Sequence, residues 1–504
     1  MLTNDYRLTT ILLSTILSSC SLAPDFTLPD VQPPAAYKES PTTETGTWQP
    51  AQPLDKESRG QWWKIFGDEK LNDLEQQAQD ANQSLKATAA RVLEARALAE
   101  SNSPSILPDL DIGGNAVRSE TGGASLAAFG FPSHGPLHPY NLYTGQGTLS
   151  YEADLFGSIR DNYKAYSLDA DAEAAAYQSA LLALEADVAQ NYYSLRALDA
   201  ERQLLRDTVT IRDEANRIMQ HKFDVGEVGQ QDFTRTQSEL AAAKADLISL
   251  DRNRSTLEHA LAVLIGKMPA EFSFAESPLA NVPPEIPPGL PSTLLERRPD
   301  ISAATASMQA ANLRIGVARA AFFPSLSLTA IGGFQSTTLS NLFHWSSRTW
   351  ALGQTAGTAL TMPIFDSGRN LDRLDEAHAA YDESVANYRQ QVLVAFRDVE
   401  DNLAAQHFLA DQSEQQDKAA TASSLTTKVI TERYQAGDID FFQVVDAERD
   451  SLAAGRAAVQ IRGQRFLATI GLIRALGGGW DMDENEDEDM EVDPDIVAEA
   501  PEEP

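Results

Sequence analysis

The segment RYQAGDIDFFQVVDAERDSL, residues 433–452, places a glycine, Gly437, between two long helical patterns. An earlier segment, KFDVGEVGQQDF at residues 222–233, places Gly226 in the same setting. Glycine accepts the left-handed backbone conformation that ends a helix. The sequence therefore predicts two sharp corners between helices, with the turn tips at Gly226 and Gly437.

The two corners belong to a longer self-similarity of the chain. Moving the sequence by 211 residues aligns Val188 with Val399, Asn191 with Asn402, Phe223 with Tyr434, Gly226 with Gly437 and Gly266 with Gly477, without a gap. Agreement over this length predicts an internal two-fold repeat, in which each copy is one structural unit.

Apolar residues recur every seven positions beside each corner. Examples are Leu181, Val188 and Leu195 in the first copy and Val385, Val392 and Val399 in the second. This spacing is typical of coiled-coil seams. Residues 160–223 contain neither Gly nor Pro, so one helix of roughly 95 Å is allowed at about 1.5 Å per residue.

Alternating side chains precede the long helices of both copies. Between Thr349 and Ile364 large apolar residues alternate with small or polar ones, and residues 110–116, 149–155 and 325–330 follow the same rule. This pattern is typical of transmembrane β-strands, although soluble hairpins on a core would also alternate. If the polar face lines a barrel, the lumen contains Ser325, Thr329, Thr349, Thr355 and Thr361.

Each copy supplies one hairpin, so one chain is expected to supply four strands. Four strands cannot close a barrel, and an open edge in lipid leaves backbone groups without hydrogen bonds. Several chains are therefore expected to share one barrel. Two chains would give eight strands and three would give twelve, and the sequence alone does not choose between them.

The N-terminus has the features of a lipoprotein leader. Arg7 precedes the apolar stretch LTTILLSTIL, residues 8–17, which is too short to span a bilayer and is followed by LSSC at residues 17–20. This resembles the lipobox of bacterial lipoproteins, which implies removal of residues 1–19 and lipidation of Cys20. Ser21, in place of an Asp, favours the outer membrane as the destination. A buried core cysteine is the alternative.

Composition divides the chain into segments. We expect a signal peptide at residues 1–19, a lipidated linker at 20–60, a first repeat at 61–276, a Pro-rich linker at 277–292, a second repeat at 293–480 and a tail at 481–504. The hairpins fall at about 107–156 and 323–365, and the long helices at about 160–266 and 369–476. The tail holds thirteen acidic and no basic residues, which predicts a solvated, disordered segment.

Charge and residue usage exclude several functions. A formal net charge of −33 argues against a nucleic-acid partner. The single cysteine rules out an internal disulfide and a cysteine-based metal cage. His134 and His138 have a ligand-like spacing, but the Pro and Gly between and around them prevent the helix that would align the two rings. We therefore expect no enzyme, no cofactor and no metal site.

Six motifs resemble those of outer membrane efflux lipoproteins, the NodT or OprM-like branch of the TolC family. They are QWWKIFGDEKLNDLEQQAQDANQSLKA (61–87), YEADLFGSIR (151–160), LLERRPDI (294–301), AAFFPSLSLTA (320–330), MPIFDSGR (362–369) and ALGGGW (475–480). The resemblance implies a homotrimer, a twelve-stranded barrel in outer membrane lipid with four strands per chain, and a long periplasmic α-helical barrel. It also implies two partners, a periplasmic adaptor and an inner-membrane RND-type pump.

The same resemblance identifies a candidate aperture. Phe442, Asp446 and Arg449 match the family positions that narrow the periplasmic end, where a hydrophobic ring is followed by an ionic one. Their spacing of four and three residues puts them on one helix face. Asp232 and Arg235, beside the first corner, are possible partners. An exposed Asp–Arg pair without a gating role is the alternative.

Three functions remain open on the sequence. The leading hypothesis is a passive exit duct of a tripartite exporter of drugs or toxic small molecules, located in the outer membrane with a periplasmic helical domain. A duct for heavy-metal ions and a non-transporting trimeric coiled-coil scaffold are the alternatives. The alternating hairpins favour a duct over the scaffold, and substrate selection is expected at the inner-membrane pump.

Overall fold

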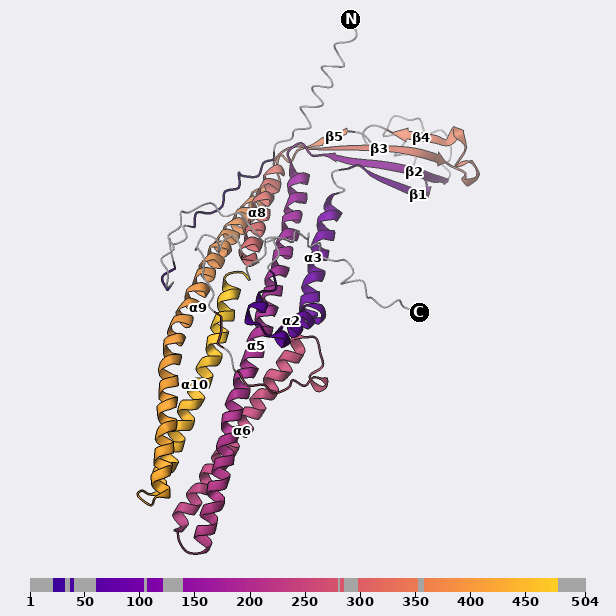
Figure 1. Ribbon diagram of the computed structural model, residues 1–504. Coiled ribbons are helices and arrows are strands. Elements are labelled where there is room, and N and C mark those ends of the chain that lie inside the picture. The colour runs from indigo at the N-terminus through magenta and orange to yellow at the C-terminus, as the bar shows by residue number, and fades with distance from the viewer. Residues whose placement is uncertain are drawn as a thin grey trace. The chain divides into compact units, whose positions relative to one another are not determined.

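A computed structural model of the protein describes residues 21–31, 37–39, 60–103, 107–120, 139–279, 282–284, 298–351 and 358–478. The structure is mostly helical, with one sheet (Figure 1). The longer helices are α2 (Glu69–Ala81), α3 (Gln83–Asn102), α5 (Ser158–Asp224), α6 (Gln230–Leu264), α8 (Pro299–Ala320), α9 (Arg369–Gln435) and α10 (Phe441–Ala475). The short 3-10 turns are η1 (Trp62–Phe66), η3 (Pro269–Glu271), η4 (Leu339–Asn341) and η5 (Trp345–Ser347).

The chain forms two compact units, and each is built from segments far apart in the sequence. The first contains Met1–Pro29, Val92–Ala172 and Ala304–Tyr388. The second contains Asp30–Arg91, Glu173–Ala303 and Arg389–Pro504. The sheet belongs to the first unit, and both helix corners belong to the second.

The sheet joins strands from both halves of the chain. It contains β1 (Asp109–Ser119), β2 (Tyr140–Ala153), β3 (Ser325–Ser336), β4 (Arg348–Ala351) and β5 (Thr358–Thr361), all in antiparallel pairs. The order is β1-β2-β3-β4, and β5 also pairs with β3 (Figure 1). The β2–β3 pairing therefore connects the hairpin of one half to the strands of the other.

The register separates an apolar face of the sheet from a polar one. Leu110, Leu149 and Ala330 lie opposite one another, as do Leu326 and Leu360, because directly paired residues share a face. Ile112 and Trp350 lie on this apolar face and are 88% and 74% exposed, so it has no cover within the described part of the chain. An apolar face left open to this degree indicates a surface that contacts something other than water.

The last strand ends earlier than the alternation of residues 349–364 predicts. β5 ends at Thr361, and Met362, Pro363 and Ile364 lie outside the sheet. Pro363 carries no backbone N–H, so it cannot donate the hydrogen bond that would continue the ladder. The apolar residues after Thr361 therefore belong to the connection that leads into α9.

Two helix pairs of matched length dominate the structure. α5 and α9 each have 67 residues, and α6 and α10 each have 35. α9 begins and ends 211 residues after α5, and α10 begins and ends 211 residues after α6. The sequence repeat has the same shift. No helix in the described residues combines the length and the apolar character that a membrane crossing requires.

An aromatic core fixes the second unit. Trp63 is 2% exposed, and Phe66 lies 5.1 Å from Tyr193, measured between ring centroids. Tyr193 in turn stacks on Phe466 at 4.3 Å, so η1, α5 and α10 meet at one cluster. Rings at these distances add about 0.5–1.5 kcal/mol per pair to the free energy of burial. The QWWKIF motif therefore serves the core of this unit.

Candidate functional site

The first corner is closed by backbone hydrogen bonds that require a left-handed residue. Gly226 has φ +78°, its N–H donates to the Phe223 carbonyl at 3.0 Å, and the Glu227 N–H donates to the Lys222 carbonyl at 2.8 Å. These bonds satisfy carbonyl groups that the end of α5 would otherwise leave free. Phe223 and Phe233 then stack across the corner at 5.4 Å, which sets the direction of α6.

The second corner repeats this arrangement. Gly437 has φ +83°, its N–H donates to the Tyr434 carbonyl at 3.0 Å, and the Asp438 N–H donates to the Arg433 carbonyl at 3.0 Å. The ammonium group of Lys222 lies 5.7 Å from the centroid of the Tyr434 ring. Both corners therefore lie at the same end of the second unit (Figure 1).

Arg235 connects two of the three aperture candidates on α10. Its guanidinium carbon lies 3.5 Å from the centroid of the Phe442 ring, and its Nη2 donates to the Asp446 carboxylate at 3.1 Å. The Arg235 side chain is 25% exposed and that of Asp446 is 52% exposed. One cation thus holds both the ring and the carboxylate, which ties α6 to α10 just past the corners.

Arg449, the third candidate, is held by a residue that the sequence did not single out. It pairs with Glu239 of α6, whose side chain is only 10% exposed, and lies 3.8 Å from Asp446. Arg212 of α5 also pairs with Glu239, at 3.3 Å. Burial raises the pKa of the neighbouring Glu448; Arg212 lowers it and Glu239 raises it further. Glu239 is therefore the shared acceptor of two arginines from different helices.

Asp232, the remaining candidate, is exposed and has no ion pair with any described residue. A signal for Glu239 was present in the sequence. Arg235 pairs with the residue 211 positions later, and Arg449 with the residue 210 positions earlier. A search for opposite charges at about this shift would have found Glu239.

The lumen candidates in the sheet share the polar face. Ser325 lies opposite Thr361, and their hydroxyl oxygens are 2.9 Å apart. Thr329 and Thr349 fall on the same face by register. Thr355, Cys20, His134 and His138 lie outside the described residues. Within the described residues no group of three or more His, Cys, Asp or Glu could hold a metal ion.

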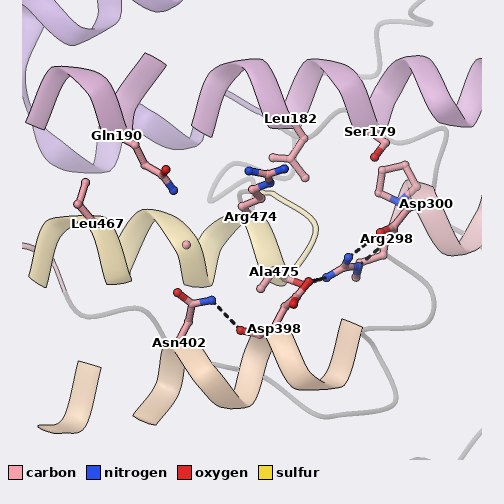
Figure 2. A pocket seen from close by; sticks show the side chains of 12 residues that line it. Ser179, Leu182, Gln190, Arg298, Asp300, Asp398, Asn402, Leu467, Arg474 and Ala475 are labelled. Atoms are coloured by element: carbon pink, nitrogen blue, oxygen red, sulfur yellow. Dashed lines mark hydrogen bonds and ion pairs between the residues drawn. The ribbon is translucent and has the colours of Figure 1, made fainter. Parts of the chain in front are cut away.

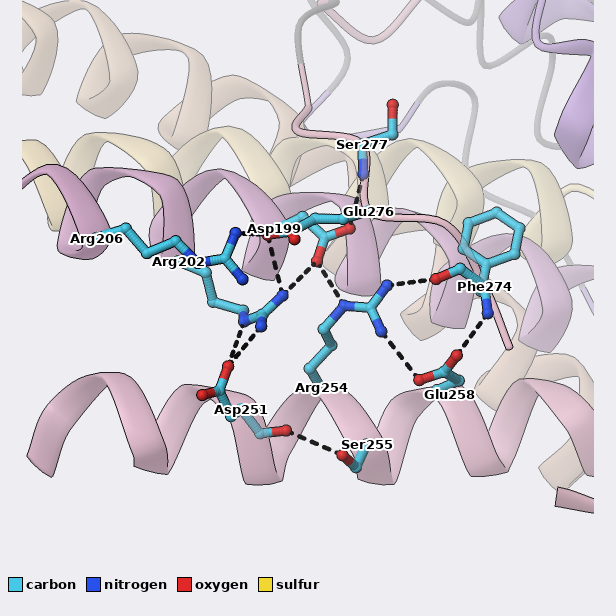
Figure 3. Close-up of polar contacts among 10 residues, drawn as sticks. All are labelled: Asp199, Arg202, Arg206, Asp251, Arg254, Ser255, Glu258, Phe274, Glu276 and Ser277. Atoms are coloured by element: carbon cyan, nitrogen blue, oxygen red, sulfur yellow. Dashed lines mark hydrogen bonds and ion pairs between the residues drawn. The ribbon is translucent and has the colours of Figure 1, made fainter. Parts of the chain in front are cut away.

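A buried charge network supports the helices of the first corner (Figure 3). The Asp199 carboxylate is fully buried and accepts from Arg254 at 2.8 Å, from Arg202 at 3.4 Å and from the Ser277 N–H at 3.0 Å. Arg254 also donates to the Phe274 carbonyl at 2.6 Å. The segment after η3 is thereby pinned against α5 and α6.

A polar cavity of about 350 Å³ lies among α5, α9 and α10 (Figure 2). Arg298, which begins the RPD part of the LLERRPDI motif, donates to the Ala475 carbonyl at 3.1 Å and pairs with Asp300 and Asp398. Asp300 also accepts from Gln391 at 2.6 Å. The charged groups on this side of the cavity are paired with one another, so the motif holds the end of α10 in place.

The structure thus has two helix–turn–helix corners, paired charges beside them and a sheet with one apolar face. A family model matches the same chain. Residues 74–267 and 290–478 match the family model described as outer membrane efflux protein. The chain belongs to the outer membrane efflux protein family. The resemblance inferred from the six motifs is confirmed, and so are efflux transport and the outer membrane location.

Relatives in this family share nearly the whole chain. The probable efflux pump outer membrane protein SepC of Pseudomonas putida is 33% identical over 94% of this chain and 96% of its own length. The outer membrane protein OprJ of Pseudomonas aeruginosa is 32% identical with the same coverage. The cation efflux system protein CusC of Escherichia coli is 29% identical over 92% of this chain and 96% of its own.

Solved structures of outer membrane channels also have this fold. The outer-membrane channel OprN superposes with a TM-score of 0.82 at 27% identity, covering 92% of this chain and all of that one. The CmeC outer membrane channel of Campylobacter jejuni gives 0.84 at 26%, covering 92% and 96%. An outer membrane efflux protein is a channel component, so the family is one of ducts and not of enzymes.

Proposed function

We propose that the protein is the exit duct of a tripartite efflux pump and that three chains form it. Each chain would contribute four strands to a twelve-stranded barrel, with the β4 and β5 segments serving as one strand. The apolar face of the sheet, with Ile112 88% exposed, supports contact with lipid. The edge strands of one chain would pair with those of its neighbours, because unpaired backbone groups are costly in lipid.

We infer that residues 61–276 and 293–480 are two copies of one repeat and that their long helices continue the duct through the periplasm. The equal lengths of α5 and α9, and of α6 and α10, support this inference. A helix of 67 residues has a length of about 100 Å at 1.5 Å per residue, which is ample for a wall of this kind. Three chains would supply twelve helical segments around one axis.

Closure of the duct is assigned to the tip network. Arg235 stacks on Phe442 and pairs with Asp446, while Glu239 pairs with Arg449 and Arg212. These contacts hold α6 and α10 together beside the corners. Docking of a periplasmic adaptor at this end would separate the helices, and an inner-membrane RND-type pump would supply the substrate. The single observation that carries the proposal is the position of this network immediately after both corners.

The transported compounds are proposed to be drugs or other toxic small molecules. SepC, which is 33% identical to this chain, is named as a probable efflux pump protein. A cation duct is the second candidate because CusC is named for cation efflux. Against it, no His, Cys, Asp or Glu cluster suited to a metal occurs in the described residues.

Planar bilayer recordings of the purified protein test the duct. We expect discrete conductance steps, and a mass in mild detergent that corresponds to three chains. A coiled-coil scaffold would give no conductance at any protein concentration. Growth of a host lacking its own duct, with and without the cognate pump, then separates drug export from cation export by the compound against which resistance returns.

A further inference from the structure

The first described residues of the chain lie against α5 and α8 in the first unit. The Ser21 hydroxyl donates to the Asp161 carboxylate at 2.6 Å. Arg319 donates to the Leu22 carbonyl at 3.2 Å, and Asn312 donates to the Pro24 carbonyl at 2.8 Å. Three hydrogen bonds thus hold the four residues from Ser21 to Pro24 in place, which is not expected of a free linker.

One face of α8 provides most of these contacts. Asn312, Gly316 and Arg319 are spaced by four and three residues, which puts them in a row along the helix. Gly316 is the point of closest approach, because a Cβ added there would lie 2.6 Å from the Ala23 nitrogen. Any other residue at 316 would therefore displace the N-terminal segment from its contact with α8.

Burial of the receptor side chains indicates that they serve this contact. Asp161 is 1% exposed and Asn312 is 4% exposed. A buried carboxylate is costly unless it accepts hydrogen bonds, and Ser21 donates one to it. Asn312 and Arg319 donate hydrogen bonds to backbone carbonyls. These side chains therefore select for an extended backbone more than for particular side chains.

These contacts lie where α5 and α8 meet the sheet within the first unit (Figure 1). Asp161 follows the end of β2 at Ala153 by eight residues, and Arg319 precedes the start of β3 at Ser325 by six. We propose that Asp161, Asn312, Gly316 and Arg319 form a receptor for the first residues of the mature chain, and that this receptor sets where the lipid anchor is attached. The part concerning the lipid rests on the proposed lipidation of Cys20.

A nitroxide spin label on Asp25→Cys tests the receptor in the full-length, detergent-solubilised protein. Asp25 is exposed and directly follows the bound segment. We expect a restricted label in the otherwise unchanged chain. In Gly316→Val, and in the double variant Asn312→Ala with Arg319→Ala, its rotational correlation time should fall about tenfold, as in a change from ordered backbone to loop motion. The double variant keeps the test valid if Gly316→Val does not fold.

Arg314→Ala is the matched control. Arg314 lies on the same helix but pairs with Asp169 of α5, and no hydrogen bond joins it to the described residues 21–31. A label that is already mobile before any receptor substitution overturns the proposal, and so does an equal gain in mobility in Arg314→Ala. A count of two spin labels per chain would show that the Cys20 thiol is free. That result would contradict the lipidation of Cys20 but not the receptor. The Asp25 label in a Cys20→Ser background then decides the receptor.

Discussion

Arg235 and Asp446 lie 211 residues apart in the chain and form an ion pair of 3.1 Å between α6 and α10. Each is the sixth residue of its helix. If this pair keeps the tip closed, Arg235→Ala should raise single-channel conductance and the entry of vancomycin, without changing the yield of trimer. Loss of about 1 kcal/mol changes the ratio of open to closed states about fivefold for each subunit.

Lys244→Ala controls for the removal of one positive charge from α6, because the Lys244–Asp213 pair is exposed on both sides. Phe442→Ala with Asp446→Ala should raise conductance further, since both partners of Arg235 are then gone. Conductance at the original value in the double variant would place the gate elsewhere.

The two faces of the sheet should differ in chemical accessibility. Thr361→Cys lies on the polar face and should react with a membrane-impermeant maleimide in intact membranes. Leu360→Cys lies on the apolar face and should react at least tenfold more slowly, roughly the effect of excluding water from a thiol. Thr349→Cys and Trp350→Cys repeat the test on β4. Similar rates at neighbouring positions would argue against a lipid-facing apolar side.

Removal of the Asp199 carboxylate should destabilise the helical unit. Asp199→Ala removes the fully buried carboxylate from Arg202 and Arg254, whose side chains are 9% and 12% exposed, and leaves them only carboxylates that are 15% to 47% exposed. We expect a loss of about 3–5 kcal/mol in the free energy of unfolding. The matched variant Asp251→Ala removes a carboxylate that is 47% exposed and pairs with the same Arg202, and should cost under about 1 kcal/mol. Urea unfolding followed by circular dichroism measures both, and equal losses would contradict a special role for Asp199.

Glu75 should make stability depend on pH. Its carboxyl group is fully buried and accepts no hydrogen bond from the residues that the structure describes, and burial together with the nearby Glu185 raises its pKa well above the usual value. The protonated form is thus favoured in the folded state. Its contribution to stability is complete below the unfolded pKa of about 4.3 and is lost as pH rises through the raised folded pKa.

Glu75→Gln should therefore melt at a higher temperature than the original protein once the pH exceeds about 4.3, and the difference should grow until the pH reaches the raised folded pKa. The exposed Asp73 of the same helix supplies the control Asp73→Asn. Thermal melts from pH 4 to pH 9 measure the effect, and parallel curves for Glu75→Gln and the unchanged protein would refute it.

Lipidation of Cys20 is a prediction of the leader sequence and of the docked Ser21. Labelled palmitate should enter the unchanged protein and not Cys20→Ser. The variant should stay partly in the membrane fraction, because the sheet does not depend on the lipid. Equal incorporation into both proteins would show that the acyl chain is attached at another residue.

The sequence by itself determined the local features of this protein. Gly226 and Gly437 end helices because their left-handed conformation depends on residues within one turn. The seven-residue spacing of Val188 and Leu195, both fully buried, marks a helix face without knowledge of its partner. Alternation likewise indicates which strand residues share a face, although the end of β5 at Thr361 depended on Pro363.

Only the tertiary structure decided which distant segments meet. The pairing of Ala153 with Leu326, the contact of Ser21 with Asp161 and the pairing of Glu239 with Arg449 each join residues more than a hundred positions apart. No local preference encodes such contacts, because a charge or a strand edge can accept many partners in an extended chain. Burial then selects among them, since a carboxylate such as Asp161 can leave water only where a donor is already in place.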